Sequence, residues 1–292
     1  MSLAEAFSPV IDAMLAQSQI KQDRALTPEN VFQEQYPANR ERFFSVASHL
    51  LEEGSGLGGL ENLAQLGKLS DQGHSCLVFA EHLSNLDVPT FWMLMKIAGP
   101  EFVPLFDRIV FLAGRKLNEE SGIVKIFAEM FARIVISPKS FYENLPEGAE
   151  KERLIAEAYA INMAAYREIR RLKTSGRIFL VYPTGTRYRP WEPATRRGGR
   201  EAESYLRSFD YFLLASCEGN LMPPERGVGM ADETPRPDRV RMNFGPVTKT
   251  AEYRQQILEE YTAALARGEN VPDEKQYIID RIMEEIAALQ CR

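Results

Sequence analysis

The chain has 292 residues, 45% of them apolar and 26% charged, so it can bury a sizeable hydrophobic core. Its 41 acidic and 35 basic residues give a net charge of −6, which argues against a general nucleic-acid binder. Three cysteines are too few and too widely spaced for a zinc site or a disulfide framework, which favours a reducing compartment.

Membrane-spanning and secretory segments are not expected. The most apolar stretch, residues 123–136, is interrupted by Lys125, Glu129 and Arg133. The N-terminus lacks a signal-peptide pattern, because Glu5 falls inside its apolar positions. We therefore expect a soluble protein of the cytoplasm.

Residues 1–70 are expected to form a small helical domain. Apolar side chains recur at helical spacing over residues 3–15 and again over 39–50. Between them, Thr27 and Pro28 resemble a helix cap followed by a first-turn proline. A further short helix is predicted over residues 60–69.

A glycine cluster at residues 54–59 formally satisfies the dinucleotide-binding fingerprint. It follows a predicted helix, whereas that fingerprint requires a preceding strand. A linker is therefore the favoured interpretation.

Residues 71–292 are expected to form an α/β domain, in which a mixed sheet is flanked by helices. The evidence is an alternation of short apolar runs with amphipathic segments. Strands are predicted at 76–80, 109–113, 133–137, 177–182, 211–216 and 240–244; helices near 88–98, 122–131 and 150–173, and over 251–290 with a break at 268–272.

The most informative stretch surrounds His82 and Asp87, directly after the predicted strand 76–80. Asp87 falls at the start of the next predicted helix, so both side chains should meet at the carboxyl end of the strand. Ligand crevices form at that edge of α/β sheets. A histidine oriented by a carboxylate is the minimal general-base unit.

A second such stretch, residues 182–190, follows the predicted strand 177–182. Pro183 and Gly185 shape a turn, and Arg187 and Arg189 offer forked donors suited to a phosphate. The surrounding segment 171–207 holds nine basic residues against three glutamates, so it should attract an anion.

Together the two stretches resemble the glycerolipid acyltransferase family. The family's first block is His, four residues, Asp, which here reads His82-Leu-Ser-Asn-Leu-Asp87. Its third block is Phe-Pro-Glu-Gly-Thr-Arg, whereas this chain has Tyr-Pro-Thr-Gly-Thr-Arg over residues 182–187. The soluble plastid-type glycerol-3-phosphate 1-acyltransferases carry Pro-Ser-Gly-Gly-Arg-Asp-Arg-Pro, which residues 183–190 match in the proline, one glycine and both arginines.

Other blocks follow in the family's order across residues 75–250. Residues 109–114 resemble the strand after the first block, and residues 135–142 resemble the lysine-bearing second block. The soluble branch has Lys-His there, but this chain has Lys139-Ser140, so only the lysine carries over. Residues 213–224 resemble the fourth block, which ends in Met-Pro-Pro, and the soluble branch also begins with a helical domain.

The resemblance implies roles for individual residues. His82 would be the general base, and Asp87 would hold its other ring nitrogen. The acceptor's phosphate would be bound by Lys139, Arg187 and Arg189. For Ser84 a capping or polar contact is favoured over an acyl-enzyme role.

Two further sets of residues are weaker candidates. Backbone N–H groups near Gly185 and Thr186 would form an oxyanion hole. Arg196, Arg197 and Arg200 would meet either the phosphates of coenzyme A or the acidic surface of an acyl carrier protein, or would simply be solvated.

The sequence therefore predicts an acyltransferase that moves a fatty acyl group from acyl-CoA or acyl carrier protein to the sn-1 hydroxyl of glycerol 3-phosphate. No metal or bound cofactor is implied, and no nucleic-acid partner is expected. One alternative is acylation of 1-acylglycerol 3-phosphate (lysophosphatidate). Another is a catalytically silent lipid- or carrier-binding scaffold of the same fold. A peripheral membrane contact through the N-terminal helices is a further hypothesis.

Overall fold

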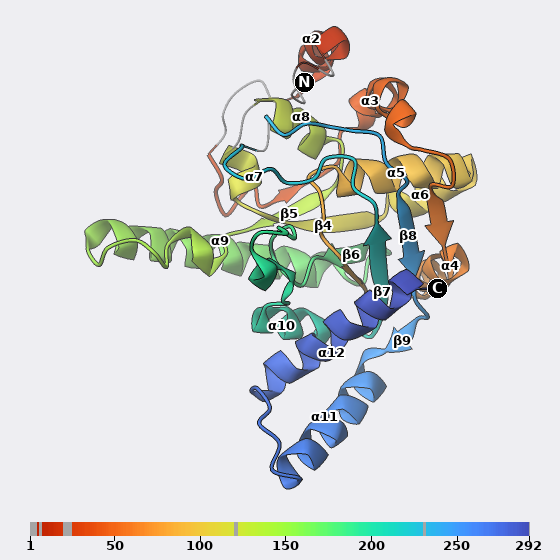
Figure 1. Cartoon of the computed structure of the whole chain (residues 1–292). Helices are drawn as coiled ribbons and strands as arrows, with labels where there is room; N and C mark the ends of the chain where they lie inside the picture. The colour runs from red at the N-terminus through yellow and green to blue at the C-terminus, as the bar shows by residue number, and fades with distance from the viewer. Residues whose placement is uncertain (1–4, 6–7, 20–24, 120–121, 230–231, 292) are drawn as a thin grey trace.

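The computed structural model describes residues 5, 8–19, 25–119, 122–229 and 232–291. Within them the chain forms a mixed nine-stranded sheet flanked by helices on both faces (Figure 1). The predicted α/β class is therefore confirmed. The strands are β1 (Phe32–Gln33), β2 (Gly56–Gly58), β3 (Cys76–Ala80), β4 (Ile109–Gly114), β5 (Arg133–Ile136), β6 (Ile178–Val181), β7 (Tyr211–Glu218), β8 (Arg241–Phe244) and β9 (Thr248–Lys249).

The centre of the sheet is parallel and its margins are mixed. The strand order is β1-β5-β4-β6-β3-β7-β8-β2, and β9 pairs with β7. β5, β4, β6, β3 and β7 run parallel, whereas β1, β8 and β9 pair antiparallel with their neighbours β5 and β7. The carboxyl ends of the five parallel strands consequently meet at one edge of the sheet.

Two layers of helices bury the central strands. On β3, Val78 belongs to the core shared with α3, α4 and α5, whereas Phe79 belongs to the core shared with α9, α11 and α12. This explains the uninterrupted apolar run of a strand covered on both faces. The helices are α2 (Ser8–Gln17), α3 (Arg40–Ala47), α4 (Leu60–Asp71), α5 (Asp87–Ala98), α6 (Val103–Phe106), α7 (Lys116–Glu119), α8 (Gly122–Glu129), α9 (Ala149–Leu172), α10 (Glu203–Leu206), α11 (Thr250–Ala266) and α12 (Glu274–Ala288).

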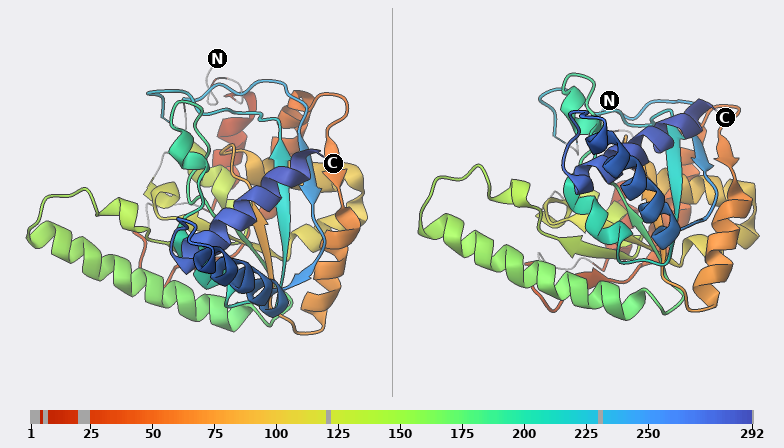
Figure 2. Two further views of the ribbon diagram at one scale, coloured as in Figure 1. Left: turned by 60° about the horizontal axis from the view of Figure 1, so that its bottom comes forward. Right: turned by 90° about the horizontal axis from the view of Figure 1, so that it is seen from below.

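The two C-terminal helices form a hairpin against one face of the sheet. Figure 2 shows α11 and α12 side by side, with α9 crossing the same face. The predicted break near residues 268–272 is confirmed, because it lies in the connection between the two helices.

The first 70 residues are not purely helical, which corrects part of the prediction. Thr27 and Pro28 begin a turn, not a helix, because the Asn30 carboxamide oxygen accepts the Thr27 N–H at 2.8 Å and the chain then enters β1. Residues Leu3 and Phe7 of the first predicted helix lie outside the described residues.

The glycine cluster is an edge strand and not a linker. Gly56–Gly58 forms β2, which pairs in parallel with β8. Gly59 then turns the chain into α4 with a φ of +67°. A Cβ there would lie 2.1 Å from the carbonyl oxygen of Phe244, so only glycine fits.

The N-terminal helices share their core with the sheet. Phe43, Ala47 and Leu50 belong to the same buried cluster as Val78 of β3. The domain boundary near residue 70 stays a prediction. Within the described ranges, no helix combines the length and apolar character needed to cross a membrane.

Candidate active site

His82 and Asp87 lie in direct contact at the carboxyl edge of the parallel strands. His82 follows β3 and Asp87 is the first residue of α5, as expected from the sequence. The His82 Nδ1 atom lies 2.8 Å from Asp87 Oδ2. A neutral imidazole paired in this way donates from Nδ1 and leaves Nε2 free to accept a proton.

The Asp87 carboxylate is held by the loop that it helps to form. Its Oδ2 atom also accepts the backbone N–H groups of Leu83 at 2.8 Å and Ser84 at 3.0 Å. The Asp87 side chain is buried, whereas His82 is 20% exposed. The carboxylate is thus fixed before any ligand binds, and the imidazole stays within reach of solvent.

Ser84 does not face the histidine. Its hydroxyl donates to the Met222 carbonyl at 3.1 Å and accepts the Leu86 N–H at 3.0 Å. The structure therefore gives Ser84 the polar-contact role that was favoured over an acyl-enzyme role.

Tyr182 packs against the face of the His82 ring, a contact that the sequence did not predict. Its ring stacks on the His82 imidazole with centroids 4.1 Å apart and planes 13° from parallel. Burial raises the pKa of the Tyr182 phenol well above its ordinary value. The tyrosine therefore stays neutral and restricts the imidazole by packing.

The turn after β6, residues 182–190 (the arginine turn), touches residues 81–87 (the histidine loop), so the two stretches of interest form one site. The Tyr188 N–H donates to the His82 carbonyl at 2.9 Å. Gly185 has a φ of +63°, and its N–H donates to the Tyr182 carbonyl at 3.0 Å. That N–H is occupied by the turn itself, whereas no described residue accepts from the Thr186 N–H.

Arg187 is bound by a buried carboxylate that the sequence did not reveal. Its Nη1 atom lies 2.7 Å from Glu233 Oε2, and the two side chains are 11% and 1% exposed. The same oxygen accepts from Asn85 Nδ2 at 3.4 Å. Glu233 thus joins the arginine turn to the loop between His82 and Asp87.

Arg189 lies on the same turn in a more open position. Its Nη1 atom lies 3.2 Å from Glu192 Oε2, and the Arg189 side chain is 35% exposed. The backbone N–H of Arg189 donates to Thr195 Oγ1, which holds the turn while the guanidinium remains accessible.

Lys139 follows β5 at the same edge but contacts a different segment. Its ammonium lies 3.6 Å from Glu201 Oε1 and the side chain is 70% exposed. It lines a cavity of about 500 Å³ with Arg200, Ser204 and Lys275. Among the described residues, no hydrogen bond or ion pair joins Lys139 to the arginine turn, so their predicted joint phosphate binding stays a prediction.

Arg196, Arg197 and Arg200 contact two different parts of the structure. Arg196 lies 3.5 Å from Glu81, the residue before His82. Arg197 and Arg200 instead form ion pairs with Asp280 and Asp273 at 3.1 and 3.3 Å, which tie their loop to the middle of α12 and to the residue before that helix. Only Arg196 therefore points towards the histidine loop.

Glu81 is a second buried carboxyl beside the histidine and was also missed. It accepts the Cys217 N–H at 3.3 Å and the Gln290 side-chain amide at 2.5 Å. Burial raises the pKa of Glu81, an effect only partly offset by the Cys217 N–H and Arg196. Because Glu81 ends an apolar strand run, its burial could have been suspected from that position.

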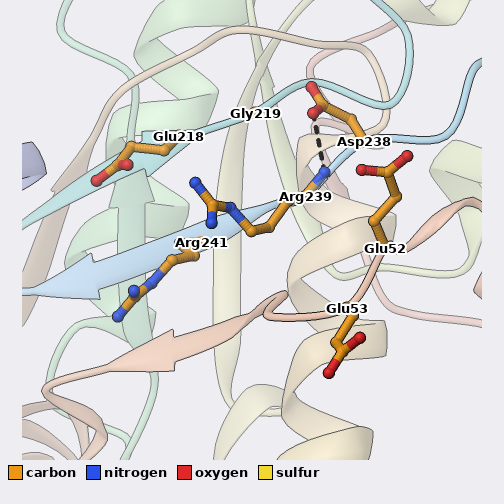
Figure 3. Close-up of a pocket in the computed structure, with 7 residues that line it drawn as sticks. All are labelled: Glu52, Glu53, Glu218, Gly219, Asp238, Arg239 and Arg241. Carbon is orange, nitrogen blue, oxygen red and sulfur yellow. Dashed lines mark hydrogen bonds between the residues drawn. The ribbon is translucent and has the colours of Figure 1, made fainter.

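A further pocket of about 470 Å³ opens where β7 and β8 meet (Figure 3). Carboxylates and guanidinium groups line it: Glu52, Glu53, Glu218, Asp238, Arg239 and Arg241, together with Gly219. Asn220 connects it to the histidine loop, since its N–H donates to Asp238 and its amide donates to the Leu83 carbonyl. Within the described ranges, no cluster of three or more His, Cys, Asp or Glu side chains could hold a metal ion.

Comparisons with known proteins add a structural likeness. No family model matches the chain, and no curated protein matches it either. Among solved structures, the chain is similar to the crystal structure of the 1-acyl-sn-glycerophosphate (LPA) acyltransferase PlsC from Thermotoga maritima. The identity is 17%, the match covers 99% of this chain and 95% of that one, and the TM-score is 0.47.

Proposed function

We propose that this protein is a glycerolipid acyltransferase that transfers a fatty acyl group from a thioester carrier to the sn-1 hydroxyl of glycerol 3-phosphate. The observation that carries the proposal is that the His82–Asp87 pair and the arginine turn lie side by side in one site. The His82–Asp87 pair supplies a base, and the hydrogen bond from Tyr188 to the His82 carbonyl places the arginine turn beside it.

The proposed reaction needs one base and no other protein nucleophile. The acceptor hydroxyl attacks the thioester carbonyl while His82 Nε2 takes its proton. The tetrahedral intermediate then expels the thiolate, which recovers that proton and leaves as the thiol, and the new ester remains on the acceptor. Asp87 keeps the Nδ1 proton in place and stabilises the imidazolium.

The acceptor's phosphate is assigned to the arginine turn. Arg189 is accessible, and Arg187 uses one nitrogen for Glu233, which leaves other N–H donors of its fork for a ligand. Holding the phosphate there would orient the hydroxyl at His82 and convert binding energy into rate. Thr186 N–H is the proposed donor to the oxyanion.

No metal or bound cofactor takes part in this proposal, and the co-substrate is acyl-CoA or acyl carrier protein. Arg196, beside Glu81, is the loop arginine best placed to meet that donor. A cytoplasmic location and a peripheral membrane contact through the N-terminal helices complete the proposal.

The test is a matrix of donors and acceptors. Purified protein is offered acyl-CoA or acyl carrier protein with glycerol 3-phosphate or lysophosphatidate. We expect acylation of glycerol 3-phosphate, lowered by about 10²–10⁴-fold in His82→Ala because general-base catalysis has that magnitude. The matched control is His49→Ala, an exposed histidine outside the site, which should leave the rate unchanged.

Three other results would overturn parts of the proposal. Acylation of lysophosphatidate alone would change the acceptor, and no transfer with any pair would support a silent scaffold. An unaffected rate in His82→Ala would remove the mechanism. Asp87→Asn should lower kcat less than His82→Ala does.

A further inference from the structure

A row of large apolar side chains lies exposed on α9. Tyr159 is 67% exposed, Tyr166 50%, Ile155 41% and Met163 39%. The opposite face of the helix is buried against the sheet through Ala165, Ile169 and Leu172. Figures 1 and 2 show the N-terminal part of α9 extending past the rest of the fold, which leaves room beside its outer face.

Six exposed residues of α9 follow a heptad pattern. They recur in alternating steps of four and three, which keeps a narrow seam on one side of a helix, and Ile155 lies beside it. The seam consists of Glu152, Ala156, Tyr159, Met163, Tyr166 and Arg170, all of them exposed. A seam of this spacing is typical of a surface that packs against another helix, whereas a helix lying on lipid usually carries a broader apolar face.

The charges of α9 distinguish the seam from the rest of the helix. Its other charged side chains have ion-pair partners within the chain, apart from Arg167: Glu150, Lys151, Arg153, Glu157, Glu168 and Arg171. Within the described residues, Glu152 at one end of the seam and Arg170 at the other form no ion pair. Among the described residues, the two ends of the seam therefore carry charges of opposite sign without an ion-pair partner. The Arg170 guanidinium lies 6.0 Å from the centroid of the Tyr166 ring.

We propose that α9 docks against α9 of a second copy of this chain in an antiparallel pair. A two-fold axis at the level of residue 161 places Glu152 opposite Arg170 of the second copy, and Tyr159 opposite its Met163. Ala156 then leaves space for Tyr166 of the second copy. Every contact occurs twice, as an isologous interface requires.

The pairing satisfies both the charges and the shape of the seam. Arg170 lies eighteen positions after Glu152, so the seam is about 27 Å long at 1.5 Å per residue. Two ion pairs close its ends, and thioether–aromatic contacts fill its centre. The interface does not involve His82 or the arginine turn, so it stands independently of the proposed function.

Sedimentation velocity over a range of concentrations tests the proposal. The wild-type protein should show a reversible monomer–dimer equilibrium. Glu152→Arg and Arg170→Glu should each raise the dimer Kd about tenfold, because two like-charge contacts replace two ion pairs. The double variant E152R/R170E should return the Kd to within about threefold of wild type. Tyr159→Asp should abolish the dimer.

Helix α4 supplies matched controls for both charge reversals. Glu61 lies in its first turn and Lys68 in its last turn, so they share the helix-dipole positions of Glu152 and Arg170. Glu61→Arg and Lys68→Glu should leave the Kd unchanged. Circular dichroism checks that all variants are folded.

Distinct outcomes would overturn the proposal. A wild-type chain that stays monomeric at every concentration would do so, as would a dimer that the single reversals do not weaken. A monomer that sediments with phosphatidylcholine–phosphatidylglycerol vesicles, and loses this binding in Tyr159→Asp, would assign the seam to a lipid surface instead.

Discussion

Arg187 and Glu233 form an ion pair across 46 residues of sequence, with Nη1 and Oε2 2.7 Å apart and side chains 11% and 1% exposed. Glu233 lies in the long connection between β7 and β8, where no helical or strand periodicity marks it. This carboxylate binds the connection to the turn after β6 and to Asn85 of the histidine loop, which the connection also contacts through Asn220 and Met222.

The first prediction concerns the stability that depends on this pair. Arg187→Ala should lower the free energy of unfolding by about 3 kcal/mol, because it leaves the buried Glu233 carboxylate without its counter-charge. Chemical denaturation in urea measures the change. Adding Glu233→Gln to Arg187→Ala should recover at least about 1 kcal/mol, since the uncompensated charge is then removed.

Arg189 is the matched control for Arg187. It lies two residues away on the same turn, but its ion pair with Glu192 is exposed. Arg189→Ala should cost less than about 1 kcal/mol. Equal losses in the two arginine variants would show that the Arg187–Glu233 pair has no special structural role.

The second prediction concerns the stacking of Tyr182 on His82. Tyr182→Leu should lower kcat about tenfold, because an aromatic pair of this kind is worth about 0.5–1.5 kcal/mol and the imidazole would lose its fixed orientation. The KM for the phosphate acceptor should change little, since Tyr182 is not among the proposed phosphate donors. Steady-state kinetics with the acceptor identified by the activity matrix checks both values.

Tyr182→Phe is the control for the phenol hydroxyl. It keeps the stacked ring and should retain kcat within about threefold. A large loss in the phenylalanine variant would mean that the hydroxyl, and not the stacking, supports the histidine.

The sheet was predictable because its strands are buried on both faces. Cys76–Ala80 and Ile178–Val181 are continuous apolar runs, and the observed bounds of β3 and β6 lie within one residue of the predictions. β1 and β2 were missed because they have only two and three residues and belong to a sheet edge. Strands this short leave no periodic signal, and their pairing is determined by distant segments.

The part of the site whose residues lie close together in the sequence was predictable. His82 and Asp87 are five residues apart, and a strand–loop–helix connection brings them together. Glu233 and Tyr182 contact the site through the tertiary fold, so no spacing rule could identify them. Their positions depend on which strands are neighbours in the sheet. Residue spacing in a single sequence does not predict that strand order.

The third prediction compares two glycines of positive φ. Gly59→Ala should destabilise the fold by several kcal/mol, because its Cβ would lie 2.1 Å from the Phe244 carbonyl oxygen. At Gly185 nothing lies within 4 Å of an added Cβ, so Gly185→Ala should cost only the backbone strain of about 1–2 kcal/mol. Thermal and urea denaturation of the two variants check the order, which would be contradicted if Gly185→Ala were the less stable.

The fourth prediction follows from the buried Glu81 carboxyl. Burial raises the pKa of Glu81 in the folded protein above its unfolded value, so the folded state binds that proton more tightly. The free energy of unfolding should therefore fall as pH rises from the unfolded pKa of about 4.3 through the folded one. Glu81→Gln cannot ionise and keeps one carboxamide oxygen to accept from both Cys217 and Gln290, which share Oε2 in the wild type. Its stability relative to wild type should therefore increase over the same range. Urea denaturation at a series of pH values checks this, with Glu61→Gln as the exposed control. If the curves of wild type and Glu81→Gln run parallel, the fold does not raise the pKa of Glu81.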